Sequence, residues 1–319
     1  MSVSHIAVLK KAVRQVRRHG LGLVVERFLR RKAILSTPPV ACDPDSSIEI
    51  HMQVCRRDWL NAFWTLKSFR RQANVDFGLF IYLDFNVPSG VRTLFQTHFP
   101  GANLACHEWL DEQVRKRLVP IAPTLAALWR AHYSPTLYKM VNAWICARRQ
   151  RVLYLDPDVL FFAPPSELLS FARSATATKT LGIFNVARLP PADLADPGAF
   201  CLDETDVHRA YGLTLPRDFN AGIAVLCLTT LDWPLLDEAM RTLRWLPDRT
   251  LLVDQTCLAL LAAKYGWEPL DRSRYIVDNG VLGASTVASH YFGNARRDAF
   301  YAEGIPAVRK RGLPSVPQT

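Results

Sequence analysis

Two aspartates two residues apart, Asp156 and Asp158, stand inside an apolar run, R-V-L-Y-L-D-P-D-V-L-F-F, from Arg151 to Phe162. A buried strand rarely carries carboxylates unless they are paired or bind a cation, because an unpaired buried charge is costly. We expect both side chains at the carboxyl end of the strand, in the crevice where open α/β sheets bind ligands. There they would suit a hard divalent cation shared with a substrate phosphate. The alternative is a turn in which both carboxylates accept backbone amides.

Three later segments carry polar residues in a similar setting: F-N-A-G-I-A-V from Phe219 to Val225, V-D-Q from Val253 to Gln255, and H-Y-F-G-N-A-R from His290 to Arg296. With the Asp-x-Asp strand, they resemble in order and spacing the motifs of glycosyltransferase family 8. That group includes glycogenin and bacterial lipopolysaccharide galactosyltransferases, and it has the GT-A fold. The resemblance covers roughly residues 48–303 and is specific only in these motifs.

The resemblance implies roles for particular residues. Asp156, Asp158 and His290 would bind the metal, Mn²⁺ or Mg²⁺, and the imidazole favours Mn²⁺. Asp254 and Gln255 would lie beside the reacting sugar carbon, and one of them, Gln255 or Asp254, on the face opposite the leaving group of a retaining transfer. The donor would be bound by the remaining motif residues and by Lys139, seventeen residues before Asp156 where the family commonly has Arg: Asp58, Lys139, Asn220, Ala221, Gly222, Gly293 and Arg296.

Each of these roles has a simpler alternative. His290 can be a core histidine, and Asn220-Ala221-Gly222 can be a β-bulge. Asp254 can cap a helix, and Arg296 can be surface charge. The chain also departs from the family, because Arg56-Arg57-Asp58 follows the first strand where an acid usually reads the uracil ring. A uridine donor is therefore implied by the resemblance alone.

Strands that alternate with helices must position these residues, so we predict a GT-A-like α/β fold with a mostly parallel central sheet flanked by helices. Residues 118–149 are predicted to be helical in two pieces broken at Ser134-Pro135, and residues 173–217 to form a long irregular loop, a candidate lid. Asp58 is placed to cap the helix predicted at 58–71. Further strands are predicted at 48–55, 77–84, 151–162 and 219–228, and further helices at 58–71, 88–99 and 252–265.

The charge of the chain is concentrated at its N-terminus. Of the net charge of +10 over 319 residues, +8 lies between Val3 and Lys32, where nine basic residues accompany one acid, Glu26. Apolar residues at helical spacing in this window predict a basic amphipathic helix, which suits an anionic membrane surface or packs on the body. The remaining +2 is too small and too dispersed for a nucleic-acid-binding face. We therefore divide the chain into this helix (1–36), a GT-A-like domain (48–303) and a tail (304–319).

The seven cysteines are scattered and contain no C-x-x-C pair, so neither a thiolate zinc site nor a disulfide framework is predicted. No secretory signal is apparent. These features favour a cytoplasmic protein, peripheral on the inner face of the membrane.

The sequence thus predicts a metal-dependent glycosyltransferase of the hexosyl-transferring class. Its partners would be a nucleotide diphosphate-sugar, with UDP favoured, and a saccharide or lipid-linked acceptor. One alternative is a non-catalytic membrane-surface scaffold with a degenerate transferase fold. A sugar-nucleotide pyrophosphorylase is disfavoured, because no glycine-rich phosphate loop follows the first strand.

Overall fold

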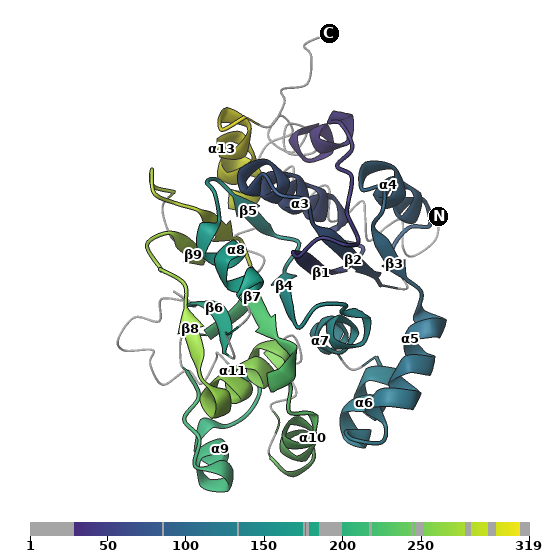
Figure 1. The fold of residues 1–319 in the computed structure, drawn as a ribbon, viewed down its shortest axis with the longest axis vertical. Coiled ribbons are helices and arrows are strands. Elements are labelled where there is room, and N and C mark those ends of the chain that lie inside the picture. Colours follow the sequence, from purple (N-terminus) through teal and green to yellow (C-terminus); the bar gives the residue numbers. More distant parts are fainter. Residues whose placement is uncertain are drawn as a thin grey trace, which may run out of the picture.

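The computed structural model describes residues 29–84, 86–132, 134–174, 176, 179–184, 200–216, 219–243, 245, 252–277, 282–292 and 298–312. Within these ranges, a central sheet separates two layers of helices (Figure 1). Its strand order is β3-β2-β1-β4-β7-β6-β8. The strands are β1 (Glu49–Val54), β2 (Gly78–Leu83), β3 (Asn103–Ala105), β4 (Arg151–Leu155), β6 (Thr180–Phe184), β7 (Phe219–Cys227) and β8 (Trp267–Pro269).

The sheet is mostly parallel. The strands from β3 to β4 all run parallel, β7 is antiparallel to both β4 and β6, and β6 is parallel to β8. A second sheet of three short strands, in the order β5-β10-β9, adjoins it: β5 (Val159–Phe161), β9 (Tyr275–Val277) and β10 (Ala288–His290). The predicted α/β class and mostly parallel sheet are confirmed.

Alternate residues of the strands face different hydrophobic cores, as the period of two in a β-strand requires. Ile50 and Leu153 face the core beneath α3, whereas Tyr82 and Tyr154 face the core beneath α7 and α11. The helices, including short 3-10 and π segments labelled η, are η1 (Ala33–Ser36), α3 (Trp59–Ala73), α4 (Gly90–His98), α5 (His107–Gln113), η2 (Val114–Leu118), α6 (Pro123–Arg130), α7 (Pro135–Cys146), α8 (Ser166–Arg173), α9 (Glu204–Tyr211), η4 (Leu228–Thr230), α10 (Trp233–Thr242), α11 (Val253–Tyr265), η6 (Phe300–Gly304) and α13 (Ile305–Lys310).

The predicted strands and helices that carry the motifs are present, with two corrections. The run 151–162 is two strands, because the turn at Asp156–Asp158 carries the chain from β4 in the large sheet to β5 in the small one. The segment 173–217 is not simply a loop. Its described parts include β6, which pairs with both β7 and β8, and α9. Residues 185–199, the middle of the candidate lid at 173–217, lie outside the described residues.

The two ends of the described chain pack on the body. Residues 29–32 are helical, Ile34 is fully buried, and the Trp64 indole donates to the carbonyl of Arg31 at 3.1 Å. The predicted basic helix otherwise falls in residues 1–28, outside the described ranges. At the other end α13 is not a free tail, because Ile305 and Val308 are buried in the core beneath α3.

All seven cysteines are free thiols in the structure. Cys146, Cys227 and Cys257 are buried, in keeping with their apolar sequence surroundings. Burial raises the pKa of the Cys146 thiol to about 11, so it stays protonated and acts as a small core residue.

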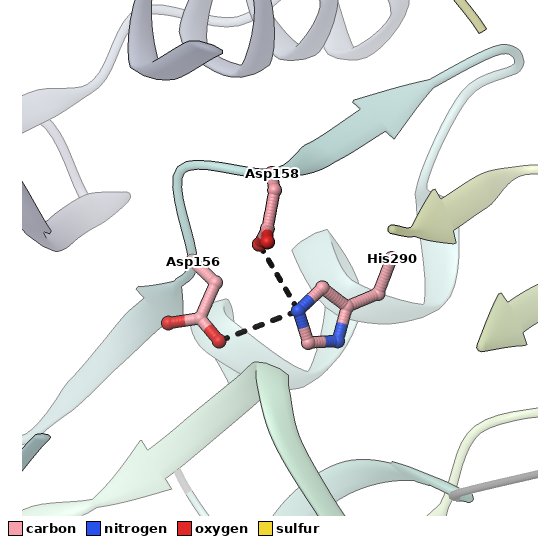
Figure 2. Close-up of side chains that lie close together, drawn as sticks. All are labelled: Asp156, Asp158 and His290. Atoms are coloured by element: carbon pink, nitrogen blue, oxygen red, sulfur yellow. Dashed lines mark hydrogen bonds and ion pairs between the residues drawn. The ribbon is translucent and has the colours of Figure 1, made fainter. Parts of the chain in front are cut away.

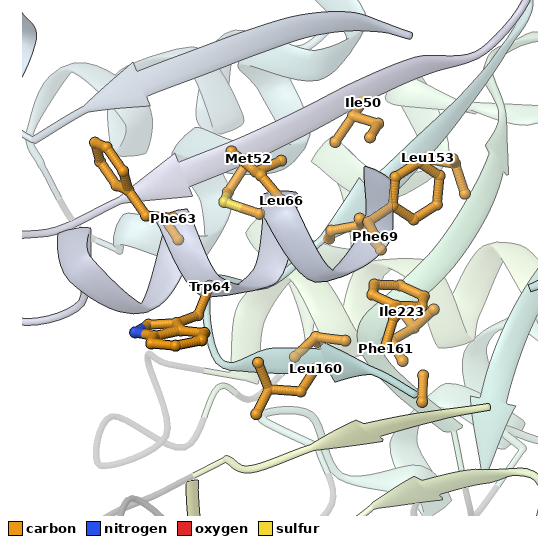
Figure 3. Close-up of a cluster of buried hydrophobic side chains, with 14 of the residues drawn as sticks. Ile50, Met52, Phe63, Trp64, Leu66, Phe69, Leu153, Leu160, Phe161 and Ile223 are labelled. Atoms are coloured by element: carbon orange, nitrogen blue, oxygen red, sulfur yellow. The ribbon is translucent and has the colours of Figure 1, made fainter. Parts of the chain in front are cut away.

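The core beneath α3 ties the two sheets together (Figure 3). Phe69 of α3 packs edge-on against Phe77, which precedes β2, and against Phe161 of β5, with ring centroids 5.7 and 5.1 Å apart. Such pairs add to the stabilisation that comes from the buried apolar area itself.

We therefore expect Phe69→Ala to lower the free energy of unfolding by about 3–5 kcal/mol, since it leaves a cavity at the junction of the two sheets. Urea denaturation followed by circular dichroism measures this change. Ile121→Ala, at an exposed isoleucine, is the control and should change stability by about 0.5 kcal/mol or less. Equal effects of the two variants would contradict this account of the core.

Candidate functional site

The turn that carries the two aspartates is held from three directions. The Asp156 amide donates to the Gly222 carbonyl of β7 at 2.9 Å, and the Tyr291 amide donates to the Asp158 carbonyl at 2.9 Å. Between them, the Thr65 hydroxyl of α3 donates to the Pro157 carbonyl at 2.7 Å. The position of both carboxylates is therefore set by backbone contacts to separate elements.

His290 reaches this turn through strand pairing. β10 runs antiparallel to β5, and His290 pairs with Val159, the residue after Asp158. Its Nε2 lies 3.1 Å from Oδ1 of Asp158 and 3.4 Å from Oδ2 of Asp156 (Figure 2). One ligand atom from each of the three residues lies within 4.8 Å of the others. The structure thus brings together the three residues that were predicted to bind metal.

The other imidazole nitrogen identifies the tautomer. Nδ1 of His290 lies 2.9 Å from Oδ1 of Asn220, and the same oxygen accepts the Gly222 amide at 2.9 Å. Because this oxygen is an acceptor, Nδ1 must carry the proton, and in the neutral ring Nε2 then presents a lone pair to two carboxylates. Three such acceptors repel one another unless a proton or a cation lies among them. Two carboxylates and one imidazole oriented by a neighbouring oxygen fit a divalent cation.

The charges of the three side chains depend on one another. Burial lowers the pKa of His290, but Asp158 and Asp156 outweigh burial, and the pKa is raised. Burial raises the pKa of Asp158. Burial acts in the same direction on Asp156, but there Lys139 and His290 prevail and hold the pKa below its usual value. The ionised form of Asp156 is thus more strongly stabilised than that of Asp158.

Lys139 lies beside the residues predicted to bind metal. Although it is only 2% exposed, its Nζ is 2.7 Å from Oδ1 of Asp156 and 3.4 Å from the ring centroid of Tyr154. Lys139 is carried by α7, which begins immediately after Ser134, whose hydroxyl accepts the Thr136 amide at 3.2 Å. In this structure, then, Lys139 pairs with a predicted metal ligand.

Asp254 and Gln255 lie in the first turn of α11. One carboxylate oxygen of Asp254 accepts the Gln255 amide at 2.7 Å and the other accepts the Tyr154 hydroxyl at 3.0 Å. The N-cap residue of α11 is Leu252, so Asp254 does not occupy the capping position. The Gln255 side-chain oxygen accepts from Nδ2 of Asn220 at 3.3 Å. The predicted reacting-carbon pair is thereby connected to the predicted metal site.

Asp58 differs from its prediction as a helix cap. It stands at the N-cap position of α3, but its side chain makes no capping hydrogen bond. Its oxygens accept instead from the Arg57 guanidinium at 2.9–3.1 Å and from the Cys55 thiol at 3.2 Å. Asp58 contributes to raising the pKa of Asp158, which places it within electrostatic reach of the aspartate turn.

The remaining predicted residues have separate outcomes. Ala221 lies in β7 with its side chain in the core beneath α7 and α11. Gly293 and Arg296 lie outside the described residues. Sequence reasoning missed Tyr154 and Thr65. Tyr154 had a recognisable signal, because it is a hydroxyl-bearing residue in a buried strand, two positions before Asp156 and therefore on the same face.

No protein-family model matches the chain, and no curated protein matches it by sequence. Among solved structures it resembles WbbM, a bifunctional glycosyltransferase, with a TM-score of 0.53 and 15% identity over 85% of this chain and 53% of WbbM, about half its length. It also resembles an active-site mutant of LgtC, with a TM-score of 0.50 and 15% identity over 85% of this chain and 98% of LgtC. LgtC in complex with donor and acceptor sugar analogues is described as a galactosyltransferase and gives a TM-score of 0.49 at 14% identity.

The chain therefore has the fold of GT-A glycosyltransferases, built here on a mostly parallel central sheet. At this level of identity the likeness shows the fold, and the chemistry has to be argued from the side chains of this chain.

The backbone of β7 passes directly beside the His290 ring. A Cβ built on Gly222 would lie 2.2 Å from both Cε1 and Nδ1 of that ring. Gly222→Ala should therefore displace the imidazole and weaken Mn²⁺ binding by about 10–100-fold, the usual effect of disturbing a group that orients a ligand. Isothermal titration of Mn²⁺ measures the change. Gly90→Ala, where a Cβ meets nothing within 4 Å, is the control and should bind like the wild type. Wild-type affinity in a folded Gly222→Ala variant would contradict this geometry.

Proposed function

We propose that this protein is a metal-dependent glycosyltransferase that moves a hexosyl group from a nucleotide diphosphate-sugar to a saccharide or lipid-linked acceptor. The observation that supports this most strongly is the convergence of Asp156, Asp158 and His290 at the carboxyl edge of a GT-A sheet. Parallel α/β sheets bind ligands at this edge.

The charges of the site suit a diphosphate leaving group. A bound divalent cation, Mn²⁺ in our proposal with Mg²⁺ as the alternative, would offset the charge that develops on the diphosphate as the glycosidic bond breaks. Lys139 keeps Asp156 ionised and directed toward the cation position through its 2.7 Å ion pair. Arg296 is proposed to hold the diphosphate, together with Gly293, and Asn220, Ala221 and Gly222 are proposed to contact the donor sugar.

Retention of the anomeric configuration is a further part of the proposal, and it rests on the likeness to family 8. Asp254 and Gln255 would then face the reacting carbon. Both side chains are buried and hydrogen-bonded, and Gln255 shares Asn220 with the metal-binding histidine. Such preorganised polar groups favour the transition state because they need not reorient during the reaction.

The nucleotide base is assigned here to uridine as a proposal. Asp58 would contact the base from the loop after β1, but its carboxylate is engaged by Arg57. A ligand at this loop would therefore meet an Arg57–Asp58 ion pair, which offers guanidinium N–H donors beside carboxylate acceptors.

Metal-dependent binding of UDP is the test. Calorimetric titration of UDP should show binding with Mn²⁺ and a loss of at least about tenfold in affinity without it, because the diphosphate charge is then uncompensated. The double variant D156N/D158N should lose the metal-dependent part, and so should His290→Ala. The matched controls are D45N/D76N and His208→Ala, which change exposed residues and should bind like the wild type.

Other outcomes of the same titration select the alternatives. Metal-dependent binding of GDP in place of UDP would retain the transferase and refute the uridine assignment. If no nucleotide binds with metal present, the protein is a scaffold that has kept a transferase fold. In a separate activity assay, turnover of a sugar 1-phosphate with UTP would identify a pyrophosphorylase.

We also propose that residues 3–32 hold the protein at an anionic membrane surface, on the cytoplasmic face, where a lipid-linked acceptor would be presented. In the part of the chain that the structure describes, no helix is long and apolar enough to cross a membrane. The basic window joins the body beside α3, where the Trp64 indole contacts the Arg31 carbonyl.

Replacing Lys10, Lys11, Arg14, Arg17 and Arg18 by glutamine should weaken binding to vesicles that contain phosphatidylserine by about tenfold or more, since each basic residue contributes ~1 kcal/mol near such a surface. Co-sedimentation measures the binding, and neutral phosphatidylcholine vesicles give the background. Five exposed basic residues of the body, Arg115, Lys116, Arg209, Arg241 and Lys310, make the matched control. An equal loss from both sets of substitutions would refute a role specific to the N-terminal window.

A further inference from the structure

A buried tyrosine lies between the two halves of the candidate site. Tyr154 is the fourth residue of β4 and is fully buried, with its side chain in the core beneath α7 and α11. One half of the site consists of Asp156 with Lys139, and the other of Asp254 with Gln255. Tyr154 contacts a member of each half through a different part of its side chain.

The ring of Tyr154 serves the first half. Nζ of Lys139 lies 3.4 Å from the ring centroid, while the same atom is 2.7 Å from Oδ1 of Asp156. A desolvated ammonium over an aromatic face is held by the ring quadrupole. The ring therefore supports Lys139 on one side while Asp156 holds it on the other, and the ammonium stays at one place in a site where it is only 2% exposed.

The hydroxyl of Tyr154 serves the second half. It donates to Oδ2 of Asp254 at 3.0 Å, and Oδ1 of Asp254 accepts the Gln255 amide at 2.7 Å. Burial raises the pKa of Asp254, and Lys139 opposes that shift, so the carboxylate lies within electrostatic reach of the first half. A buried carboxylate that loses one of its two donors is expected to reorient or to bind a proton.

We propose that Tyr154 is a positioning residue that sets Asp254 and Gln255 relative to the metal-binding edge. It acts through Lys139 with its ring and through Asp254 with its hydroxyl. For the transfer step this inference rests on the proposed function. The support that the ring gives to Lys139 and Asp156 does not depend on it.

Two substitutions separate the ring from the hydroxyl. Tyr154→Phe keeps the ring and removes only the hydrogen bond to Asp254. Turnover of the UDP-sugar donor should then show kcat lowered by about tenfold or more, with donor KM and Mn²⁺ affinity within about twofold of the wild type. Tyr154→Leu removes both contacts and should in addition weaken Mn²⁺ binding by about threefold or more, because Lys139 no longer fixes Asp156.

Tyr82→Phe is the matched control. Tyr82 is a buried tyrosine in β2 of the same sheet, and its hydroxyl is also hydrogen-bonded, to His51 at 2.5 Å and to the Asn142 carbonyl at 3.1 Å. It should lower the melting temperature as Tyr154→Phe does, while kcat, KM and Mn²⁺ affinity stay within about twofold of the wild type. A merely structural role for Tyr154 would make the two variants alike in every measurement.

A second comparison tests the route through Asp254. In an Asp254→Ala background, Tyr154→Phe should lower kcat by less than about twofold, because the hydroxyl has lost the group through which it acts. A full tenfold loss in that background would overturn the assignment, and so would wild-type kcat in Tyr154→Phe alone.

Failure of the proposed function gives a different result. If the wild type binds Mn²⁺ but neither binds nor turns over a nucleotide-sugar, the transferase proposal fails. The Mn²⁺ affinities of Tyr154→Leu and Tyr154→Phe then decide the inference: weakening in the leucine variant alone supports positioning by the ring, and equal affinities overturn it.

Discussion

Three carboxylates lie close together at one edge of the sheet, Asp254 buried and Asp156 and Asp158 partly buried, and neighbouring groups compensate for their charge. Like charges in a poorly solvated site favour protonation, and burial does raise the pKa of Asp158 and Asp254. Asp156 escapes this because Lys139 and His290 act on it. The compensating groups are Lys139 of α7 and His290 of β10, so the packing of these two elements brings the cationic side chains to the acids.

The local features of the fold follow from sequence patterns. The apolar run before Asp156 predicted the strand β4, and Ser134-Pro135 predicted the start of the helix α7. Both predictions succeeded because strand and helix-start signals lie in residues adjacent in the chain. The segment 173–217 was wrongly expected to be irregular, since β6 is a five-residue strand whose support comes from β7 and β8. These partner strands are distant in the chain, so the β-propensity of residues 180–184 alone does not predict the pairing.

For the candidate site too, the sequence predicted some features and missed others. The motif residues could be listed from the sequence, and the structure places Asp156, Asp158 and His290 within reach of one ion. The sequence did not indicate that Lys139 would pair with Asp156, that Arg57 would occupy Asp58, or that Tyr154 would reach Asp254. These contacts depend on which helix covers which face of the sheet. That arrangement is decided by packing between segments far apart in the chain, so the local sequence pattern does not reveal it.

The pairing of β5 with β10 determines when the candidate site can form during synthesis of the chain. Asp158 and His290 are 132 positions apart in the chain, and the pairing of β5 with β10 brings them together. A polypeptide that emerges from the ribosome up to β7 already carries both aspartates of the turn but lacks the imidazole. The site is therefore completed only after β10 has been synthesised, and a fragment that ends before His290 does not contain it. Contacts of such long sequence separation form slowly, because the closing of a large loop precedes the interaction that stabilises it.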